Sequence, residues 1–242
     1  MHNLHPKQQT ISVIVPTYNE VANIGPLLDQ LTKVLHLHDY QIIVVDDSSP
    51  DGTSRIVQQR ATLYPRVLLL QRPGKLGLAA AVLDGFNASN GHLVVMMDAD
   101  LSHRPEDLPT LLLAASQAEI VIGSRYAKGG AIRDWPLHRR FSSRIAGALA
   151  RAILRLTVTD PTSGFAVFHR HILSRLASGP PPPGFKLTLA ALALNPGATV
   201  AEVPITFVNR CRGRSKFTPA EVLRFLRLCW QLRATRHLSA SP

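Results

Sequence analysis

The first half of the chain alternates short apolar runs with longer stretches in which apolar residues recur every three or four positions. The short runs predict buried strands over residues 11–15, 42–45, 67–70, 93–97 and 119–122. The longer stretches predict helices, one of which carries its apolar residues at Ile24, Leu27, Leu28, Leu31 and Leu35. Pro16 is expected to stop the first strand, since proline has no N–H for a ladder. Strands that alternate with helices indicate an α/β fold with a mostly parallel sheet flanked by helices.

The second half of the chain predicts fewer strands and two basic helices. A helix from about Pro136 to Leu156 has apolar residues on one face and arginines on another. The apolar face holds Ile145, Leu149, Ala152 and Leu156, and the basic face holds Arg140, Arg144, Arg151 and Arg155. Such a helix binds a membrane surface, or it packs on the core with a solvated arginine face. A strand over 200–208, near a sheet edge because of Pro204, precedes a last basic amphipathic helix over 219–234.

Composition and charge narrow the class of protein. The 242 residues suffice for one large α/β domain, and 45% hydrophobic with 18% charged residues is ordinary for a folded protein. The formal net charge of +11 indicates an anionic partner. The two cysteines form no disulfide framework, which fits a reducing compartment. Residues 1–10 lack the apolar core of a secretory signal, and no apolar run is long enough to span a membrane, so we expect any membrane contact to be peripheral.

Two aspartates directly follow the apolar run of residues 93–97. Asp98 and Asp100 therefore lie at the carboxyl end of a predicted strand, where open α/β sheets bind their ligands. Residues i and i+2 of an extended chain point the same way, and two such carboxylates repel each other unless a cation lies between them. Their hard oxygen atoms suit magnesium or manganese, which also bind substrate phosphates. The pattern favours a metal–diphosphate site, and the alternative is a solvated turn that holds two acids.

Two other predicted strands also end in turns or acids, at residues 16–20 and at Asp46-Asp47. The carboxyl ends of parallel strands meet at one edge of a sheet, so these segments are expected near Asp98. Acids at such positions accept hydrogen bonds from a ribose or a base. The set is what a nucleotide-sugar pocket needs, although Asp46 alone would equally serve as a strand-end cap.

At this point the chain resembles the family 2 glycosyltransferases of GT-A fold, and within them the dolichol- or polyprenol-phosphate mannose synthases. The motifs that carry the resemblance occur in the family's order over about residues 11–217. They are V-P-T-Y-N-E at 15–20, D-D-S-S-P-D-G-T at 46–53, K-L-G-L at 75–78, D-A-D-L-S-H at 98–103, G-S-R-Y at 123–126, S-G-F at 163–165, V-P-I at 203–205 and G-R-S-K at 213–216. One of these motifs alone would be weak evidence for the family, but the whole set in this order is specific to it.

The resemblance implies a role for individual residues. The donor-binding residues would be Pro16, Tyr18, Glu20, Val45, Asp47, Asp98, Ala99, Asp100, Arg125, Arg210 and Lys216. The acceptor phosphate would be held by Arg125, Arg139 and Ser143. Asp98 and Asp100 would bind Mg²⁺ or Mn²⁺, and with Arg125 they form the expected catalytic set. Ser102 stands where some relatives have a glutamine ligand, so a third metal ligand at this position stays open.

The implied reaction moves mannose from GDP-mannose to a polyprenyl or dolichyl monophosphate with inversion, giving a β-linked product. A phosphate monoester, with a second pKa of about 6, is already mostly ionised at neutral pH, so no general base is needed. The expected partners are these two substrates and a membrane surface, reached peripherally from the cytoplasmic face or through a small anchoring subunit. The chain is expected to be one GT-A domain over 1–242, with a nucleotide-sugar half at 11–125, an acceptor-side half at 126–217 and an amphipathic helix and tail at 218–242.

Two other functions stay open from the sequence. A transferase of the same class could use UDP-glucose or another nucleotide sugar, because pocket shape sets that choice. A basic nucleic-acid-binding protein would explain the charge, but the arginines are not interleaved with stacking aromatics and aromatic residues are only 6% of the chain. We therefore expect no nucleic-acid partner.

Overall fold

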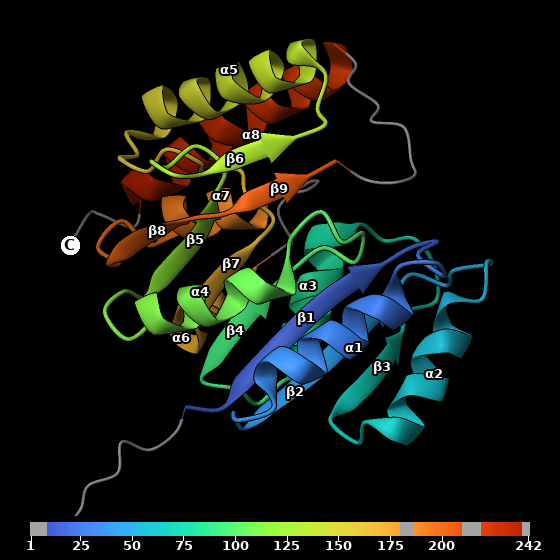
Figure 1. Ribbon diagram of the computed structural model, residues 1–242. Helices are drawn as coiled ribbons and strands as arrows, with labels where there is room; N and C mark the ends of the chain where they lie inside the picture. The colour runs from blue at the N-terminus through green and yellow to red at the C-terminus, as the bar shows by residue number, and fades with distance from the viewer. Residues whose placement is uncertain (1–8, 180–185, 210–218, 239–242) are drawn as a thin grey trace, which may run out of the picture.

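A computed structural model describes residues 9–179, 186–209 and 219–238 of the chain (Figure 1). Its main sheet has seven strands in the order β3-β2-β1-β4-β7-β5-β8, and every pair is parallel except those of β7. These strands are β1 (Ile11–Thr17), β2 (Tyr40–Asp46), β3 (Val67–Gln71), β4 (Leu93–Met96), β5 (Ile120–Ser124), β7 (Ala166–His169) and β8 (Val200–Pro204). A small second sheet pairs β6 (Ala131–Arg133) with β9 (Thr206–Val208). The predicted α/β architecture with a mostly parallel sheet is confirmed.

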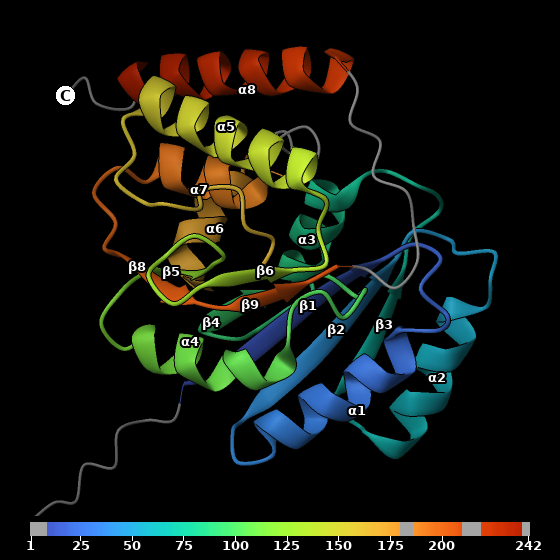
Figure 2. The ribbon, with the colours of Figure 1, turned by 45° about the horizontal axis from the view of Figure 1, so that its top comes forward.

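The helices form layers on both faces of the main sheet (Figure 2). They are α1 (Ile24–Leu35), α2 (Thr53–Leu63), α3 (Leu78–Asn87), α4 (Leu108–Ala114), α5 (Leu137–Leu154), α6 (Arg170–Ala177), α7 (Leu187–Leu194) and α8 (Pro219–Leu238), with a 3₁₀ turn η1 (Pro105–Asp107) before α4. One core lies between the sheet and α1, α2 and α4, and the other lies between the sheet and α3, α6 and α7. Helices α5 and α8 lie side by side as an outer layer over α7.

The apolar run before Asp98 is buried on both faces of the sheet, as predicted. Val94 and Met96 of β4 pack into the core with α3, whereas Val95 and Met97 pack into the core with α1. This alternation follows from the two-residue period of a strand. Burial on both faces fixes the register of β4, and with it the place where Asp98 leaves the sheet.

Two predicted strand boundaries were wrong. Pro16 does not stop the first strand, because β1 runs on to Thr17 and Pro16 is paired with Val45 of β2. The proline is tolerated because the pairing of β1 with β4 ends at Ile14, so Pro16 has a strand neighbour on one side only. The strand expected over 200–208 is two strands, since the chain leaves the main sheet at Ile205 and enters the small one. Pro204 does lie at an edge, in the outermost strand β8.

The apolar face predicted for α5 is not the face that packs on the core. The buried residues of α5 are Gly147, Ala150 and Leu154, and the small Gly147 and Ala150 let the helix approach its neighbours closely. Four large apolar side chains of α5 are exposed instead: Leu137, Phe141, Ile145 and Leu149. On α8 the apolar residues divide in the same way, with Phe225 and Leu228 buried and Leu223 and Trp230 exposed. Within the described ranges, no helix is both long and apolar enough to cross a membrane.

Candidate active site

The candidate site lies where β1, β2, β4 and β5 end at the same edge of the sheet. A cavity of about 270 Å³ opens there, beyond the ends of β4 and β5 and below the start of α5. It brings together four residues that the sequence singled out: Asp98, Arg125, Arg139 and Ser143. Its remaining lining is Leu78, Met96, His103, Trp135, Ser142, Ala146, Thr162, Gly164, Lys186 and Phe207. The sheet edge therefore places acidic and basic candidates around one space.

Asp98 lies at the wall of this cavity, with its side chain about a quarter exposed. Its Oδ2 is 3.9 Å from Nδ1 of the buried His103. The His103 ring is held between Phe165, at a centroid distance of 5.3 Å, and Phe207, at 5.1 Å. Gly164 leaves room for the carboxylate, because a Cβ there would be 3.0 Å from Asp98 Oδ2. The carboxylate is thus confined by a rigid aromatic cluster and a glycine.

Asp100 is held in a turn rather than on an extended strand, so the sequence argument from strand alternation was wrong in its geometry. Strand β4 ends at Met96, and Leu101 has a positive φ of 59°. Asp100 is buried, and its Oδ1 accepts hydrogen bonds from the backbone N and the hydroxyl of Ser102. Ser102 therefore orients the carboxylate of Asp100. Among the described residues, no group of three or more Asp, Glu, His or Cys side chains could hold a metal.

The two acids at the end of β2 have different surroundings. Asp46 is fully buried and accepts hydrogen bonds from Thr17, Ser49 and Ser54, so it organises the turn after the strand. Asp47 forms an ion pair of 2.6 Å with Arg72. Arg72 also lies 2.9 Å from Asp84 of α3 and donates to the carbonyl of Gly77. Arg72 therefore bonds both to Asp47, a predicted donor-binding residue, and to the start of α3.

The other donor-side candidates differ in what they can offer a ligand. Pro16 and Val45 are buried in the sheet and Ala99 is buried beside Asp98, so little more than their backbone faces outward. Tyr18 is exposed, with the Lys75 ammonium 3.9 Å above its ring. Glu20 is half-buried and accepts a hydrogen bond from Asn23. Arg210 and Lys216 lie outside the described residues.

The basic residues of the cavity are held by aromatic rings. The guanidinium of Arg139 lies 4.0 Å from the centre of the Trp135 ring and donates to Asn209. The guanidinium of Arg125 lies within 5.6 Å of the rings of Tyr126, Trp135 and Phe207. The indole N–H of the buried Trp135 has no acceptor in the described part of the chain, so a ligand oxygen or a water is its available partner.

Residues 12–177 match the model of a protein family described as glycosyl transferase family 2. The chain belongs to glycosyl transferase family 2. It is 38% identical over 226 residues to a dolichol-phosphate mannosyltransferase of Pyrococcus furiosus, covering 92% of this chain and 63% of that one. It is 40% identical over 228 residues to a polyprenol monophosphomannose synthase of Mycolicibacterium smegmatis, covering 90% and 84%. The chain thus spans less than two thirds of the Pyrococcus relative.

A third relative, an undecaprenyl-phosphate mannosyltransferase of Micrococcus luteus, is 37% identical and covers 86% of this chain and 87% of that one. Among solved structures, the chain is similar to glucosyl-3-phosphoglycerate synthase from Mycobacterium tuberculosis, with a TM-score of 0.68 at 22% identity. That match covers 94% of this chain and 80% of the other. It shows the shared GT-A fold, and the expected family and fold are therefore both confirmed.

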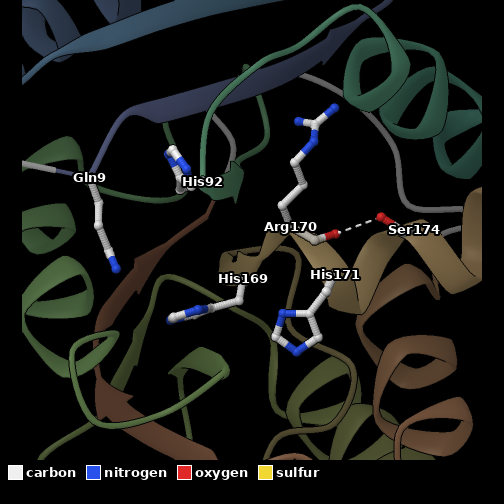
Figure 3. A pocket seen from close by; sticks show the side chains of 6 residues that line it. All are labelled: Gln9, His92, His169, Arg170, His171 and Ser174. Atoms are coloured by element: carbon white, nitrogen blue, oxygen red, sulfur yellow. Dashed lines mark hydrogen bonds between the residues drawn. The ribbon is translucent and has the colours of Figure 1, made fainter. Parts of the chain in front are cut away.

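This family 2 glycosyltransferase has a second hollow, of about 400 Å³, near the opposite ends of β1 and β4 (Figure 3). It is lined by Gln9, His92, His169, Arg170, His171 and Ser174. Each histidine already has a partner within the chain, since the rings bond to Thr10, Ala115 and Glu119. The guanidinium of Arg170 donates to carbonyls and a hydroxyl of residues 86–91. None of the candidate site residues named from the sequence lines this hollow.

Sequence reasoning missed several residues around the candidate site: Arg72, His103 as a contact of Asp98, Trp135, Asp160, Gly164 and Lys186. Gly164 lies in S-G-F, a motif that carries the family resemblance without a role for this residue, and Asp160 lies three residues before that motif. Lys186 reaches the cavity from the residue before α7, and its ammonium is 4.9 Å from the centre of the Phe225 ring of α8. A proline- and glycine-rich segment separates Lys186 from the preceding helix, and nothing local in the sequence places it there.

We expect Arg72→Gln to lower the free energy of unfolding by about 3–5 kcal/mol, because it leaves the buried Asp47 without its counter-ion. The same variant should bind the donor nucleotide more weakly, since Asp47 and the start of α3 lose their common support. Urea denaturation and titration with GDP would measure the two effects. Arg66→Gln is the matched control, because Arg66 forms an exposed ion pair of 3.6 Å with Asp39 and should cost less than about 1 kcal/mol. Equal losses in both variants would contradict the proposed role of Arg72.

Proposed function

We propose that this glycosyltransferase moves mannose from GDP-mannose to a polyprenyl or dolichyl monophosphate, with inversion and with a divalent metal ion. The observation that carries the proposal is the cavity in which Asp98 and Arg125, after β4 and β5, share a lining with Arg139 and Ser143 of α5. The names of the relatives support it, since each names a mannosyltransferase or mannose synthase of a dolichol, polyprenol or undecaprenyl phosphate. We retain the division into a donor half over 11–125 and an acceptor-side half over 126–217, although the main sheet takes strands from both.

Magnesium or manganese fits the chemistry of Asp98, which lines the cavity, and of the buried Asp100 in the turn that follows it. Asp98 and Asp100 offer the hard carboxylate oxygens that these ions prefer. Ser102 holds Asp100 in a fixed orientation, and we assign its hydroxyl this role in preference to metal ligation. The neighbour from Mycobacterium tuberculosis was solved with Mn²⁺ and UDP-glucose, which supports a divalent ion in proteins of this fold. When bound, the ion would neutralise the donor diphosphate and stabilise it as a leaving group.

The chain's own residues then have a positioning task. The acceptor phosphate is already ionised, so the site needs no general base. Arg125, Arg139 and Ser143 would hold that phosphate, and guanidinium groups suit it because they bind two oxygens at once. Stacking on Trp135 and the bond to Asn209 limit the motion of Arg139 before substrate arrives. Fixed donors of this kind lower the barrier by orientation and charge stabilisation.

The decisive experiment is a transfer assay with labelled GDP-mannose and a short polyprenyl phosphate, with and without Mg²⁺ or Mn²⁺. We expect label in the lipid only when the ion is present, and its removal by EDTA should stop the reaction. UDP-glucose is the competing donor, because the structural neighbour binds that sugar nucleotide. Label from UDP-glucose alone would replace the donor in this proposal and keep the fold and acceptor. No transfer from either donor, in detergent and in membranes, would contradict the proposed function.

We propose that the exposed apolar side chains of α5 and α8 bring the enzyme to its lipid substrate. Leu137 and Phe141 lie on the first turns of α5, next to Arg139 and Ser143, so the same helix presents apolar groups to a membrane and polar groups to the cavity. Leu223, Trp230 and the exposed Arg224 and Arg227 add apolar and basic groups from α8. Such a mixture suits an anionic membrane interface. We place the enzyme on the cytoplasmic face, because the free thiol of Cys229 fits a reducing compartment. Burial of this thiol in the protein raises its pKa to about 11.

We expect Phe141→Asp to reduce binding to vesicles that contain anionic lipid by about tenfold or more, because it replaces an apolar group at the interface by a charge. Co-sedimentation with the vesicles would measure it. Leu113→Asp is the matched control, since Leu113 is 74% exposed and Phe141 is 69% exposed, but Leu113 lies on α4 at the other face of the sheet. A wild-type protein that does not bind the vesicles would favour a separate small membrane-anchoring subunit, and equal losses in both variants would contradict the assigned face.

A further inference from the structure

Arg125 is bound on one edge by a single buried carboxylate. Its Nε donates to Asp160 Oδ2 at 2.7 Å and its Nη2 donates to Asp160 Oδ1 at 2.7 Å. The backbone N of Arg125 also donates to Asp160 Oδ2, at 3.0 Å. The side chains are 9% and 0% exposed. This two-pronged arrangement is the geometry in which a guanidinium has the least freedom to turn.

Asp160 is in turn fixed by Glu202 of the edge strand β8. Glu202 Oε1 accepts from the backbone N of Asp160 at 2.9 Å and from the hydroxyl of Thr159 at 2.8 Å. Its Oε2 accepts from the backbone N of Thr159 at 2.6 Å. Glu202 is paired in register with Ile122 of β5, and β5 leads directly into Arg125. Strands β5 and β8 are labelled in Figure 1. Hydrogen bonds to Glu202 therefore hold the turn that contains Asp160 against strands β5 and β8, and Arg125 directly follows β5.

This network leaves the Nη1 group of Arg125 for a ligand. Its bonds to described residues use the backbone N, Nε and Nη2, while the rings of Tyr126, Trp135 and Phe207 surround the guanidinium. Arg125 nevertheless lines the cavity. Burial alone would lower the pKa of Arg125, but the hydrogen bonds and charge of Asp160 outweigh it and raise that pKa above its usual value. The group stays charged, and its direction is set by Asp160.

We propose that Asp160, held by Glu202, is the positioning residue that aims Arg125 at the substrate phosphates during sugar transfer. This inference rests on the function proposed above. Removing a buried partner of this kind allows the guanidinium to turn and deprives it of the fixed orientation on which phosphate binding depends. Asp160 then acts through Arg125, and it has no separate contact with the substrates to lose.

A double-mutant cycle tests this coupling. The variants are Arg125→Gln, Asp160→Asn and the double variant, and the readouts are kcat and KM for a polyprenyl phosphate together with equilibrium binding of farnesyl phosphate. We expect Asp160→Asn to lower kcat/KM by about 10–100-fold and Arg125→Gln to lower it by about 100-fold or more. The double variant should lie within about threefold of Arg125→Gln alone. Fully additive losses would overturn the proposal, because Asp160 would then act independently of Arg125.

Glu202→Gln is the second variant, in case loss of the buried charge in Asp160→Asn prevents folding. It should lower transfer in the wild-type background and have little effect when Arg125 is already Gln. Glu119→Gln is its matched control, because Glu119 likewise accepts from the backbone N and hydroxyl of a threonine, Thr199, but lies at the other end of the sheet. We expect the control to keep wild-type kcat and KM. Equal losses of transfer activity in Glu119→Gln and Glu202→Gln would contradict a positioning role for Glu202 and would show that it only stabilises the fold.

The outcomes separate this inference from the proposed function. If the wild-type enzyme transfers mannose but the losses in the double-mutant cycle are additive, the proposed function stands and the proposed role of Asp160 is wrong. If the wild-type enzyme uses another donor but binds farnesyl phosphate, the cycle can still be measured by equilibrium binding of farnesyl phosphate. That measurement alone then tests the role of Asp160. A wild-type enzyme that neither binds farnesyl phosphate nor transfers sugar overturns the proposed function, and the role of Asp160 falls with it.

Discussion

Replacing Asp98 by Asn should lower the rate of sugar transfer about a thousandfold. The substitution keeps the shape of the side chain but removes the charge that would hold a divalent ion against the donor diphosphate, a contribution of several kcal/mol. The fold should survive, because Asp98 lies on the cavity wall with its side chain about a quarter exposed. Transfer kinetics at several Mn²⁺ concentrations, with the melting temperature alongside, would measure the effect.

A nearby acid provides the control for this substitution. Glu106 is exposed and lies 3.6 Å from Arg104, at the start of the 3₁₀ turn that follows the D-A-D-L-S-H segment. Glu106→Gln removes the same charge from the same part of the chain, and we expect transfer within about twofold of wild type, because surface ion pairs contribute little. Near-normal transfer by Asp98→Asn would refute the proposed metal site.

The second large effect is expected from Gly164→Ala. A Cβ at this position would meet Asp98 Oδ2 at 3.0 Å and His103 Cε1 at 3.3 Å. The His103 ring is packed between Phe165 and Phe207 and has little room to move, so the carboxylate of Asp98 must shift instead. The shift needed is a few tenths of an ångström, and because a misplacement of about 1 Å costs about a hundredfold in rate, this smaller shift should cost about tenfold. We expect this loss in kcat, together with weaker binding of Mn²⁺.

Gly147→Ala is the matched control for Gly164→Ala. A Cβ at Gly147 would meet its nearest neighbour, Cδ of Pro161, at 3.9 Å, which is an ordinary contact. Since glycine inside a helix is unfavourable, this variant should keep its activity and gain about 0.5–1 kcal/mol of stability. If Gly164→Ala transfers sugar as fast as Gly147→Ala, the carboxylate of Asp98 is not confined in the way that the structure indicates.

The parts of the site that could be predicted from the sequence are those that depend only on neighbouring residues along the chain. Asp98 and Asp100 follow an apolar run, and such a run ends at the carboxyl edge of a buried strand whatever the rest of the chain does. Asp47 and the start of the 16–20 segment follow for the same reason. The ordered motifs then assigned the chain to its family. Roles for Arg139 and Ser143 came from that resemblance alone, and they remain predictions.

The parts that could not be predicted depend on contacts between distant segments. Strand β7 and helix α6 were missed because β7 is only four residues long and continues directly into α6. Without β7 there was no reason to place Asp160 beside Arg125, or Gly164 beside Asp98. The buried face of α5 was misjudged because two of its three buried residues, Gly147 and Ala150, are small and contribute little to an apolar pattern. Close packing of small residues is decided by the neighbouring helices.

The antiparallel insertion of β7 between β4 and β5 also has a consequence for the order in which the enzyme is made. A nascent chain that has reached residue 165 contains the whole D-A-D-L-S-H segment and Arg125, but the edges of β4 and β5 that β7 will pair with are both open. The two walls of the cavity then have no fixed separation. Unpaired strand edges also invite association with other chains. Synthesis that stalls between β5 and β7 would therefore release an aggregation-prone fragment that carries the D-A-D-L-S-H segment without the assembled cavity.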